Sequence, residues 1–130
     1  MTNGRFDHIG IIVSDMAKSL AFYRLLGLDV PPEADQEGHV EVRLPGGLRL
    51  GFDTEAVIRS FHDGPIPAGP GRVNLGFVCP DAAAVDDLHA RVVAAGYRSE
   101  IAPFDAPWGQ RYATVVDPDG TGVDLFTPLS

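Results

Sequence analysis

The sequence is poor in cysteine, in basic residues and in long apolar runs. Its one cysteine, Cys79, excludes an internal disulfide and a zinc site made of cysteines alone. Ten Lys and Arg residues stand against 18 Asp and Glu residues, and the net charge of −8 makes nucleic acids and anionic membranes poor partners. No apolar run approaches the roughly 20 residues of a membrane span, and the first residues resemble no secretion signal. We therefore expect a cytoplasmic protein.

The composition is otherwise that of a globular domain. The 130 residues are 45% hydrophobic and 22% charged. This is enough apolar material to bury a core without a disulfide or a structural metal ion. We predict one domain over residues 1–130 that handles a small molecule.

An internal repeat is the most informative pattern in the chain. Residues 8–15 (HIGIIVSD) and residues 74–81 (NLGFVCPD) begin 66 positions apart, about half the chain length. Each segment is an apolar strand that ends in an aspartate able to cap the start of a helix. Apolar residues at helical spacing follow in both halves, and Gly27 and Gly96 terminate the two predicted helices. The matching order of elements indicates a duplication.

Short strands separated by turn residues are predicted after each helix. They cover 39–44 and 48–52 in the first half and 111–116 and 123–126 in the second, with weaker strand patterns at 28–30 and 98–101. The predicted fold class is α+β, with two strand–helix–strand–strand–strand (βαβββ) modules at about 1–62 and 72–130. A linker rich in proline and glycine joins them at 63–71.

Alternation along the strands predicts which side chains face away from the helices. In the strand that starts at residue 39, the polar residues His39, Glu41 and Arg43 alternate with apolar ones. A tight turn at 45–47 then places His39 across from Asp53, at about 5 Å between Cβ atoms.

The same polar side is expected to carry several glycines. They are Gly10, Gly51, Gly76 and Gly122, and Asn74 and Asp124 lie on this side too. Glycine weakens a strand interior unless something approaches the backbone closely. We therefore predict a curved mixed sheet around a roomy polar cleft, with the helices outside.

A set of motifs runs through nearly the whole chain in a fixed order. They are His8–Asp15, Phe22-Tyr23, Leu26-Gly27, Asp117–Gly120 and Val123–Leu125. In this order they resemble the vicinal oxygen chelate superfamily, which includes glyoxalase I, extradiol dioxygenases and bleomycin-binding proteins. The resemblance implies paired βαβββ modules around a cleft, usually within a homodimer.

Further stretches resemble the metal-free, mitomycin-resistance-type drug-binding proteins of that superfamily. They are residues 15–20, 22–24, 46–47, 108–113 and 123–126. Such proteins sequester a planar antibiotic between aromatic side chains. The resemblance implies that His39 and Trp108 stack on the ligand. A different interpretation of Trp108 is a hydrophobic plug at the dimer interface, where large aromatic residues are common.

Metal-using members of the superfamily take ligands from four strand positions, which hold His8, Gly51, Asn74 and Asp124 in this sequence. Glycine offers no ligand, and a side-chain amide is a weak one for a borderline divalent ion. His8 and Asp124 remain, one short of the three protein ligands typical of a catalytic site. We interpret the protein as metal-free, with a divalent ion on His8 and Asp124, completed by a group such as Glu41, as the alternative.

The leading hypothesis is therefore a non-catalytic binding protein of the antibiotic-resistance type, without a cofactor. A planar aromatic or quinone-like ligand would stack on His39 and Trp108. Polar contacts would come from Glu41, Arg43, Asp53, Asn74 and Asp124. Two alternatives are a metal-dependent enzyme, either a glyoxalase-type lyase or an extradiol-type dioxygenase, and a metal-free biosynthetic enzyme that uses the His39–Asp53 pair for acid–base chemistry. No Ser-His-Asp order, phosphate-binding loop or dinucleotide fingerprint is present.

Overall fold

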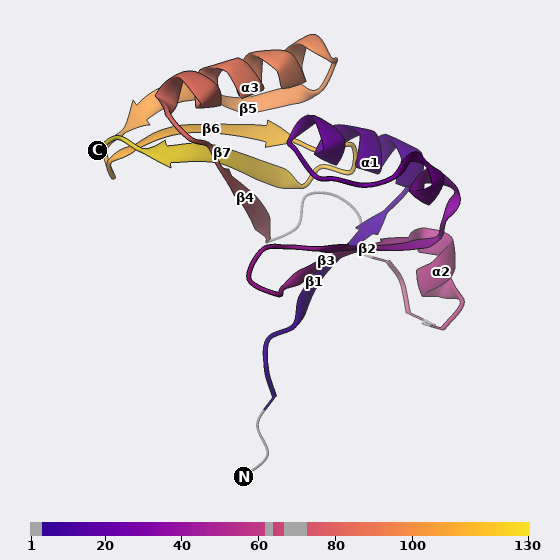
Figure 1. Cartoon of the computed structure of the whole chain (residues 1–130). Helices are drawn as coiled ribbons and strands as arrows, with labels where there is room; N and C mark the ends of the chain where they lie inside the picture. Colours follow the sequence, from indigo (N-terminus) through magenta and orange to yellow (C-terminus); the bar gives the residue numbers. More distant parts are fainter. Residues whose placement is uncertain (1–3, 62–63, 67–72) are drawn as a thin grey trace. The chain divides into compact units, whose positions relative to one another are not determined.

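The computed structural model describes residues 4–61, 64–66 and 73–130 (Figure 1). The chain divides into two compact units, Met1–Ile66 and Pro67–Ser130, and each has its own sheet. Most of the predicted linker at 63–71 lies outside the described residues. The α+β fold class is confirmed. The expected cleft depends on both modules together and stays a prediction.

The described residues of the first unit form three strands and three helical segments. They are β1 (His8–Val13), α1 (Met16–Leu25), the 3₁₀ helix η1 (Pro32–Gln36), β2 (His39–Arg43), β3 (Arg49–Thr54) and α2 (Glu55–Arg59). The strand order is β1-β3-β2, with β1 parallel and β2 antiparallel to β3. The central strand β3 therefore has β1 on one side and β2 on the other, and its side chains lie next to those of both strands.

The strand predicted at 28–30 is wrong, so the first unit has one strand fewer than a βαβββ module. The guanidinium of Arg24 donates to the carbonyl oxygens of Val30 and Pro31, both at 2.9 Å. These bonds tie the segment to α1. Pro31 and Pro32, which have no backbone N–H, then lead into η1. The prediction also missed α2.

Local signals determine where α1 begins and ends, and buried aromatic rings pack the helix against β3. The Asp15 carboxylate accepts a hydrogen bond from the backbone N–H of Lys18 at 3.1 Å, as an N-cap does. Gly27 has a φ of 106°, a left-handed conformation that favours glycine. The ring of Tyr23 lies 5.3 Å from that of Phe52, and both side chains are fully buried. The helix-facing side of the first sheet is therefore its core side.

The second unit has the predicted βαβββ order. Its elements are β4 (Asn74–Val78), α3 (Ala82–Ala94), β5 (Arg98–Ala106), β6 (Gln110–Val116) and β7 (Gly122–Pro128). The strand order is β4-β7-β6-β5, with β4 parallel to β7 and the other pairs antiparallel. β5 is much longer than the predicted strand at 98–101, and it brings additional side chains to the sheet.

The helix α3 packs against β5, β6 and β7 and covers one face of the second sheet (Figure 1). Asp81 caps it by accepting from the backbone N–H of Ala84 at 2.8 Å, and Gly96 follows its end with a φ of 99°. Val85, Val123 and Leu125 are fully buried in this core. Within the described part of the chain, none of the helices is both long and apolar enough to cross a membrane.

Candidate functional site

In the first unit, the sheet face away from α1 presents a grid of side chains. The register aligns Ile12, Asp53 and His39 in one row, Gly10, Gly51 and Glu41 in the next, and His8, Arg49 and Arg43 in the third. This face, called the open face below, carries the predicted set His39, Glu41 and Arg43. The predicted alternation is confirmed, because Val40, Leu50 and Phe52 are buried on the opposite side.

The centre of the open face is bare backbone. Gly10 and Gly51 are register partners in the parallel pair β1 and β3. A β-carbon added to Gly10 would meet no atom within 4 Å, and one added to Gly51 would meet only backbone oxygens at 3.9 Å. The two peptide segments therefore form a flat surface between the flanking rows, on which a planar group has room to lie.

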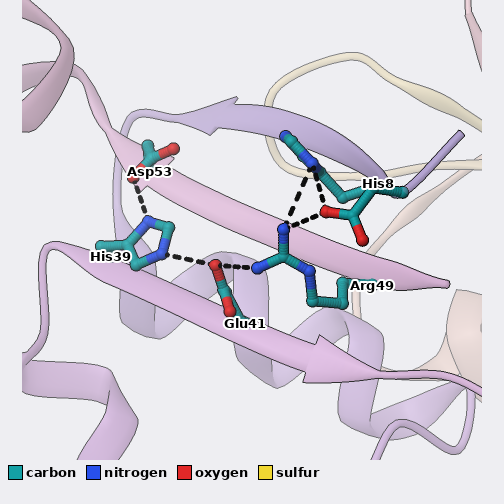
Figure 2. A network of polar contacts seen from close by, with 6 residues as sticks. His8, His39, Glu41, Arg49 and Asp53 are labelled. Atoms are coloured by element: carbon teal, nitrogen blue, oxygen red, sulfur yellow. Dashed lines mark hydrogen bonds and ion pairs between the residues drawn. The ribbon is translucent and has the colours of Figure 1, made fainter. Parts of the chain in front are cut away.

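His39 is held at both ring nitrogens. Its Nδ1 lies 2.6 Å from Asp53 Oδ1, and its Nε2 lies 3.1 Å from Glu41 Oε2 (Figure 2). The Asp53 contact is the one predicted from the turn at 45–47, whose register is confirmed by the 2.8 Å bond from the Leu44 N–H to the Leu48 carbonyl oxygen. About half of the His39 side chain stays exposed.

Arg49 extends this cluster towards the other end of the face. Its Nη1 donates to Glu41 Oε2 at 2.6 Å, and its Nη2 donates to Asp7. His8 Nδ1 lies 3.3 Å from Asp7 Oδ2 and 3.5 Å from the same Nη2 of Arg49. Asp53, His39, Glu41, Arg49, Asp7 and His8 are thus linked by consecutive contacts and are called the polar network below. Figure 2 labels all of them except Asp7.

Neighbouring charges shift the pKa values of several groups in the polar network. The hydrogen bond to Asp53, followed by the one to Glu41, raises the pKa of His39 above its usual value. The hydrogen bond from Arg49 lowers the pKa of Glu41 and of Asp7, with a smaller contribution from the neighbouring histidine in each case. His39, Glu41 and Asp7 therefore favour their charged forms.

A hollow of about 320 Å³ lies beside β2. Its lining residues are Asp29, Val30, Pro31, Glu33, Ala34, Glu37, His39, Val40, Glu41 and Val42. The acidic members add negative charge near the His39 side of the open face.

In the second unit, an aromatic cluster forms around Trp108, on the sheet face away from α3. The indole lies edge-on to the rings of Phe104 and Tyr112, with centroid distances of 6.0 and 5.2 Å. Trp108 lies in the predicted loop, now the turn between β5 and β6, where Gly109 has a φ of 89°. Its Nε1 donates to Gln110 Oε1 at 2.9 Å. The indole is oriented by three neighbours and is still 59% exposed.

Polar groups lie beside this aromatic cluster. The Thr114 hydroxyl donates to Asp124 Oδ1 at 2.9 Å, across the register pair of β6 and β7. Burial raises the pKa of the Tyr112 hydroxyl, and the nearby carboxylate of Asp124 raises it further. Asp124 thus offers an acceptor next to an aromatic surface.

Two strand glycines of the second unit make room for neighbouring side chains. A β-carbon at Gly76 would lie 3.2 Å from the Phe126 ring, which extends over this position. A β-carbon at Gly122 would lie 2.7 Å from Asn74 Oδ1. Gly76 and Gly122 are therefore filled by neighbours, whereas Gly10 and Gly51 are open.

The structure brings some of the predicted site residues together. His39, Glu41 and Asp53 form one cluster, whereas Arg43 makes no ion pair or hydrogen bond with another described residue. Trp108 and Asp124 lie on one face of the sheet in the second unit. The Asn74 side chain packs on the backbone of Gly122, its register partner.

The sequence did not reveal several residues that contact the predicted site residues. Asp7 precedes the first strand, so strand alternation gave no signal for it. Phe104 belongs to the part of β5 that was not predicted, and Gln110 and Tyr112 stood outside the predicted set. A longer strand prediction through 106 would have placed Phe104 opposite Tyr112, as observed.

The four metal-ligand positions do not fit a divalent ion. Gly51 supplies no donor atom, and the Asn74 amide packs against backbone. The guanidinium of Arg49 lies beside His8 and is ion-paired with Glu41, the group expected to complete a site. A cation already at this position opposes the binding of another.

The chain matches a protein-family model over most of its length. The model of the Glyoxalase/Bleomycin resistance protein/Dioxygenase superfamily matches residues 5–125. None of the curated proteins compared with the chain matches it.

Solved structures match over nearly the whole chain. A glyoxalase/bleomycin resistance protein/dioxygenase family enzyme from Burkholderia phytofirmans PsJN is 18% identical, with a TM-score of 0.79 and coverage of 97% of this chain and 100% of that one. A glyoxalase-related enzyme from Fulvimarina pelagi is 20% identical, with a TM-score of 0.78 and coverage of 95% and 87%. A superfamily member from Sphaerobacter thermophilus DSM 20745 is 26% identical, with a TM-score of 0.66 and coverage of 96% and 98%.

Proposed function

Because the chain belongs to the Glyoxalase/Bleomycin resistance protein/Dioxygenase superfamily, we propose that it is a metal-free protein that binds a planar aromatic or quinone-like compound. In this proposal it sequesters the compound without turnover, as drug-binding resistance proteins do. The observation that carries the proposal is Trp108, a large aromatic side chain that is oriented by its neighbours but mostly exposed.

Trp108 has the features of a preformed stacking surface. Its contacts with Phe104 and Tyr112 are edge-on, at interplanar angles of 87° and 81°, and its N–H is already bonded to Gln110. A ligand that stacks on it need not order a mobile side chain, which removes part of the entropic penalty of binding. Stacking adds about 1 kcal/mol beyond the burial of area.

The open face of the first unit supports the same ligand class. The Gly10–Gly51 surface accommodates a flat group, and the exposed imidazole of His39 lies in a neighbouring row. Polar side chains surround this surface, as expected for a ligand with ring substituents such as carbonyl or amino groups. In the second unit, the carboxylate of Asp124 would accept hydrogen bonds from such substituents.

One observation favours a second candidate, a metal-free enzyme that uses acid–base chemistry. The His39–Asp53 contact of 2.6 Å resembles the pairing of a catalytic histidine with its orienting carboxylate. However, Glu41 accepts at Nε2, the nitrogen that would exchange a proton with substrate. A substrate would first have to displace Glu41, so we prefer binding without turnover.

The proposal includes a homodimer, which the family resemblance suggests. Size-exclusion chromatography with light scattering measures the mass directly. A mass of one chain, 13.9 kDa, at all concentrations would contradict this part of the proposal.

Fluorescence tests the ligand class, because Trp108 is the only tryptophan in the chain. Menadione, a flat naphthoquinone, and mitomycin C are titrated into the protein while the indole emission is recorded. We expect saturable quenching, since a quinone stacked on an indole accepts an electron from its excited state. N-acetyltryptophanamide serves as the control for collisional quenching. Linear quenching by both probes, with the slope of this control, would contradict the proposal.

A further inference from the structure

The His39 ring is held at both of its edges. Asp53 lies at Nδ1 and Glu41 at Nε2, and a carboxylate only accepts hydrogen bonds. Both nitrogens must therefore carry a proton for both contacts to be hydrogen bonds, which makes the ring an imidazolium. A ligand on the open face then meets the flat side of the ring rather than a free nitrogen.

The Glu41 end of this arrangement depends on Arg49. One oxygen, Glu41 Oε2, receives both His39 Nε2 and Arg49 Nη1. The other end of the guanidinium is fixed by Asp7. The Arg49 side chain is only 25% exposed, less than its partners Glu41 (43%) and Asp7 (44%). The guanidinium thus fixes the position of Glu41, which otherwise has several rotamers of similar energy.

We propose that Arg49 is a positioning residue for the ligand site: acting through Glu41, it fixes the plane of the His39 ring so that the ring presents its face to a planar ligand. The inference rests on the proposed function, because it requires the planar ligand to stack on His39, as the leading hypothesis from the sequence has it. Arg49 itself needs no contact with the ligand.

The arrangement makes ligand binding dependent on pH. Asp53 of β3 and Glu41 of its own strand contact the His39 ring and favour the imidazolium. The guanidinium of Arg49, which shares Glu41 Oε2 with the ring, opposes it by its charge. Asp29, Glu33 and Glu37 line the hollow beside the ring. As pH rises through the raised pKa of His39, the ring loses a proton and one of its two carboxylate contacts. The ring is then free to turn, and affinity for a planar ligand falls.

Proton NMR titration of the His39 ring tests the positioning role without any ligand. The resonance is assigned by its absence in His39→Gln. The variants are Arg49→Gln and Arg49→Lys, with Arg43→Gln as the matched control. Arg43 is the register partner of Arg49 on the same face, and it makes no ion pair with a described residue. Its replacement removes the same charge without disturbing Glu41.

The pKa of His39 should move in one direction if Arg49 positions Glu41 and in the other if Arg49 acts only through its charge. Removing a nearby cation should by itself raise the pKa of His39. If Arg49 positions Glu41, Arg49→Gln instead lowers the pKa by about half a pH unit, the size that an exposed ion pair supports. Arg49→Lys keeps the charge but not the two-sided geometry, and it should lower the pKa as well. An unchanged or raised pKa in both Arg49 variants would overturn the inference.

Glu41→Gln provides a second route if Arg49→Gln does not fold. It leaves Arg49 in place and should lower the pKa of His39, because the acceptor charge is lost. An unchanged pKa in this variant would also overturn the inference.

Menadione affinity is then measured by calorimetry across pH. In wild type the affinity should fall as pH rises. Arg49→Gln should weaken binding on the order of fivefold at neutral pH and move the fall to lower pH. Arg59→Gln removes the same charge from α2, outside the proposed site, and should leave both unchanged. A normal pH profile in Arg49→Gln would contradict the positioning role. If wild type binds neither menadione nor mitomycin C, the proposed function fails, whereas the titration of His39 still decides whether Arg49 positions the ring.

Discussion

Replacing Trp108 by alanine should separate the contribution of this side chain to folding from its contribution to ligand binding. Its contacts within the protein are two edge-on aromatic neighbours and one exposed hydrogen bond to Gln110. Edge-on aromatic contacts contribute about 0.5–1.5 kcal/mol each, and an exposed hydrogen bond contributes less. We therefore expect the free energy of unfolding to fall by about 1–3 kcal/mol, with the fold retained.

The loss in binding follows from the exposed area. A fully covered tryptophan buries about 150–250 Å², and Trp108 is 59% exposed, which leaves on the order of 100–150 Å² for a ligand. A flat ligand covers one face, about half of this area. At about 25 cal/mol per Å², plus about 1 kcal/mol for stacking, the contact is worth about 2–3 kcal/mol. The dissociation constant should rise about 30- to 150-fold.

Isothermal titration calorimetry with menadione measures this change, because the alanine variant has no indole to observe by fluorescence. Phe61→Ala is the matched control, since Phe61 is 72% exposed and lies outside the aromatic cluster. Chemical denaturation of both variants provides the free energies of unfolding. An affinity within about twofold of wild type in Trp108→Ala, a change below roughly 0.4 kcal/mol, would refute the stacking role of this residue.

Two further predictions concern the open face. Gly51→Ala should raise the free energy of unfolding by up to about 1 kcal/mol, because glycine weakens a strand and the new β-carbon meets no side chain. The same substitution should weaken menadione binding, because the β-carbon stands on the surface where the ligand would lie. Denaturation and calorimetry measure the two effects, and an unchanged affinity would show that the ligand does not use the glycine surface. Added Zn²⁺ or Ni²⁺ should leave the melting temperature unchanged, because the positive charge of Arg49 lies beside His8 and opposes the binding of a cation. A rise in melting temperature that is lost in His8→Ala would instead support the metal-dependent alternative.

Local patterns in the sequence were sufficient for much of the fold. Helix limits follow from Asp15 and Asp81 as caps and from glycines at the ends, all within one turn of the helix concerned. Strand alternation placed His39 and Asp53 on one face, and the short turn between β2 and β3 left only one register that keeps their alternation. These features depend on neighbours close in sequence, so the sequence alone determined them.

The segment at 28–30 shows where local patterns are insufficient. Its apolar residues resemble a strand, but the side chain of Arg24 binds the carbonyl oxygens of Val30 and of the following Pro31 and holds the segment against α1. A strand needs a partner with free backbone groups, and a contact from another element satisfied these carbonyls first. The outcome depended on tertiary structure.

The same distinction applies to the candidate site. The sequence alone determined which polar and glycine residues share a face, because side-chain direction repeats every two residues along a strand. Only the tertiary structure decided which of them meet: Arg49 reaches Asp7, 42 positions earlier, and shares one oxygen of Glu41 with His39. Such contacts depend on the register between distant strands and on the rotamers of long side chains, and neither is encoded by a local pattern.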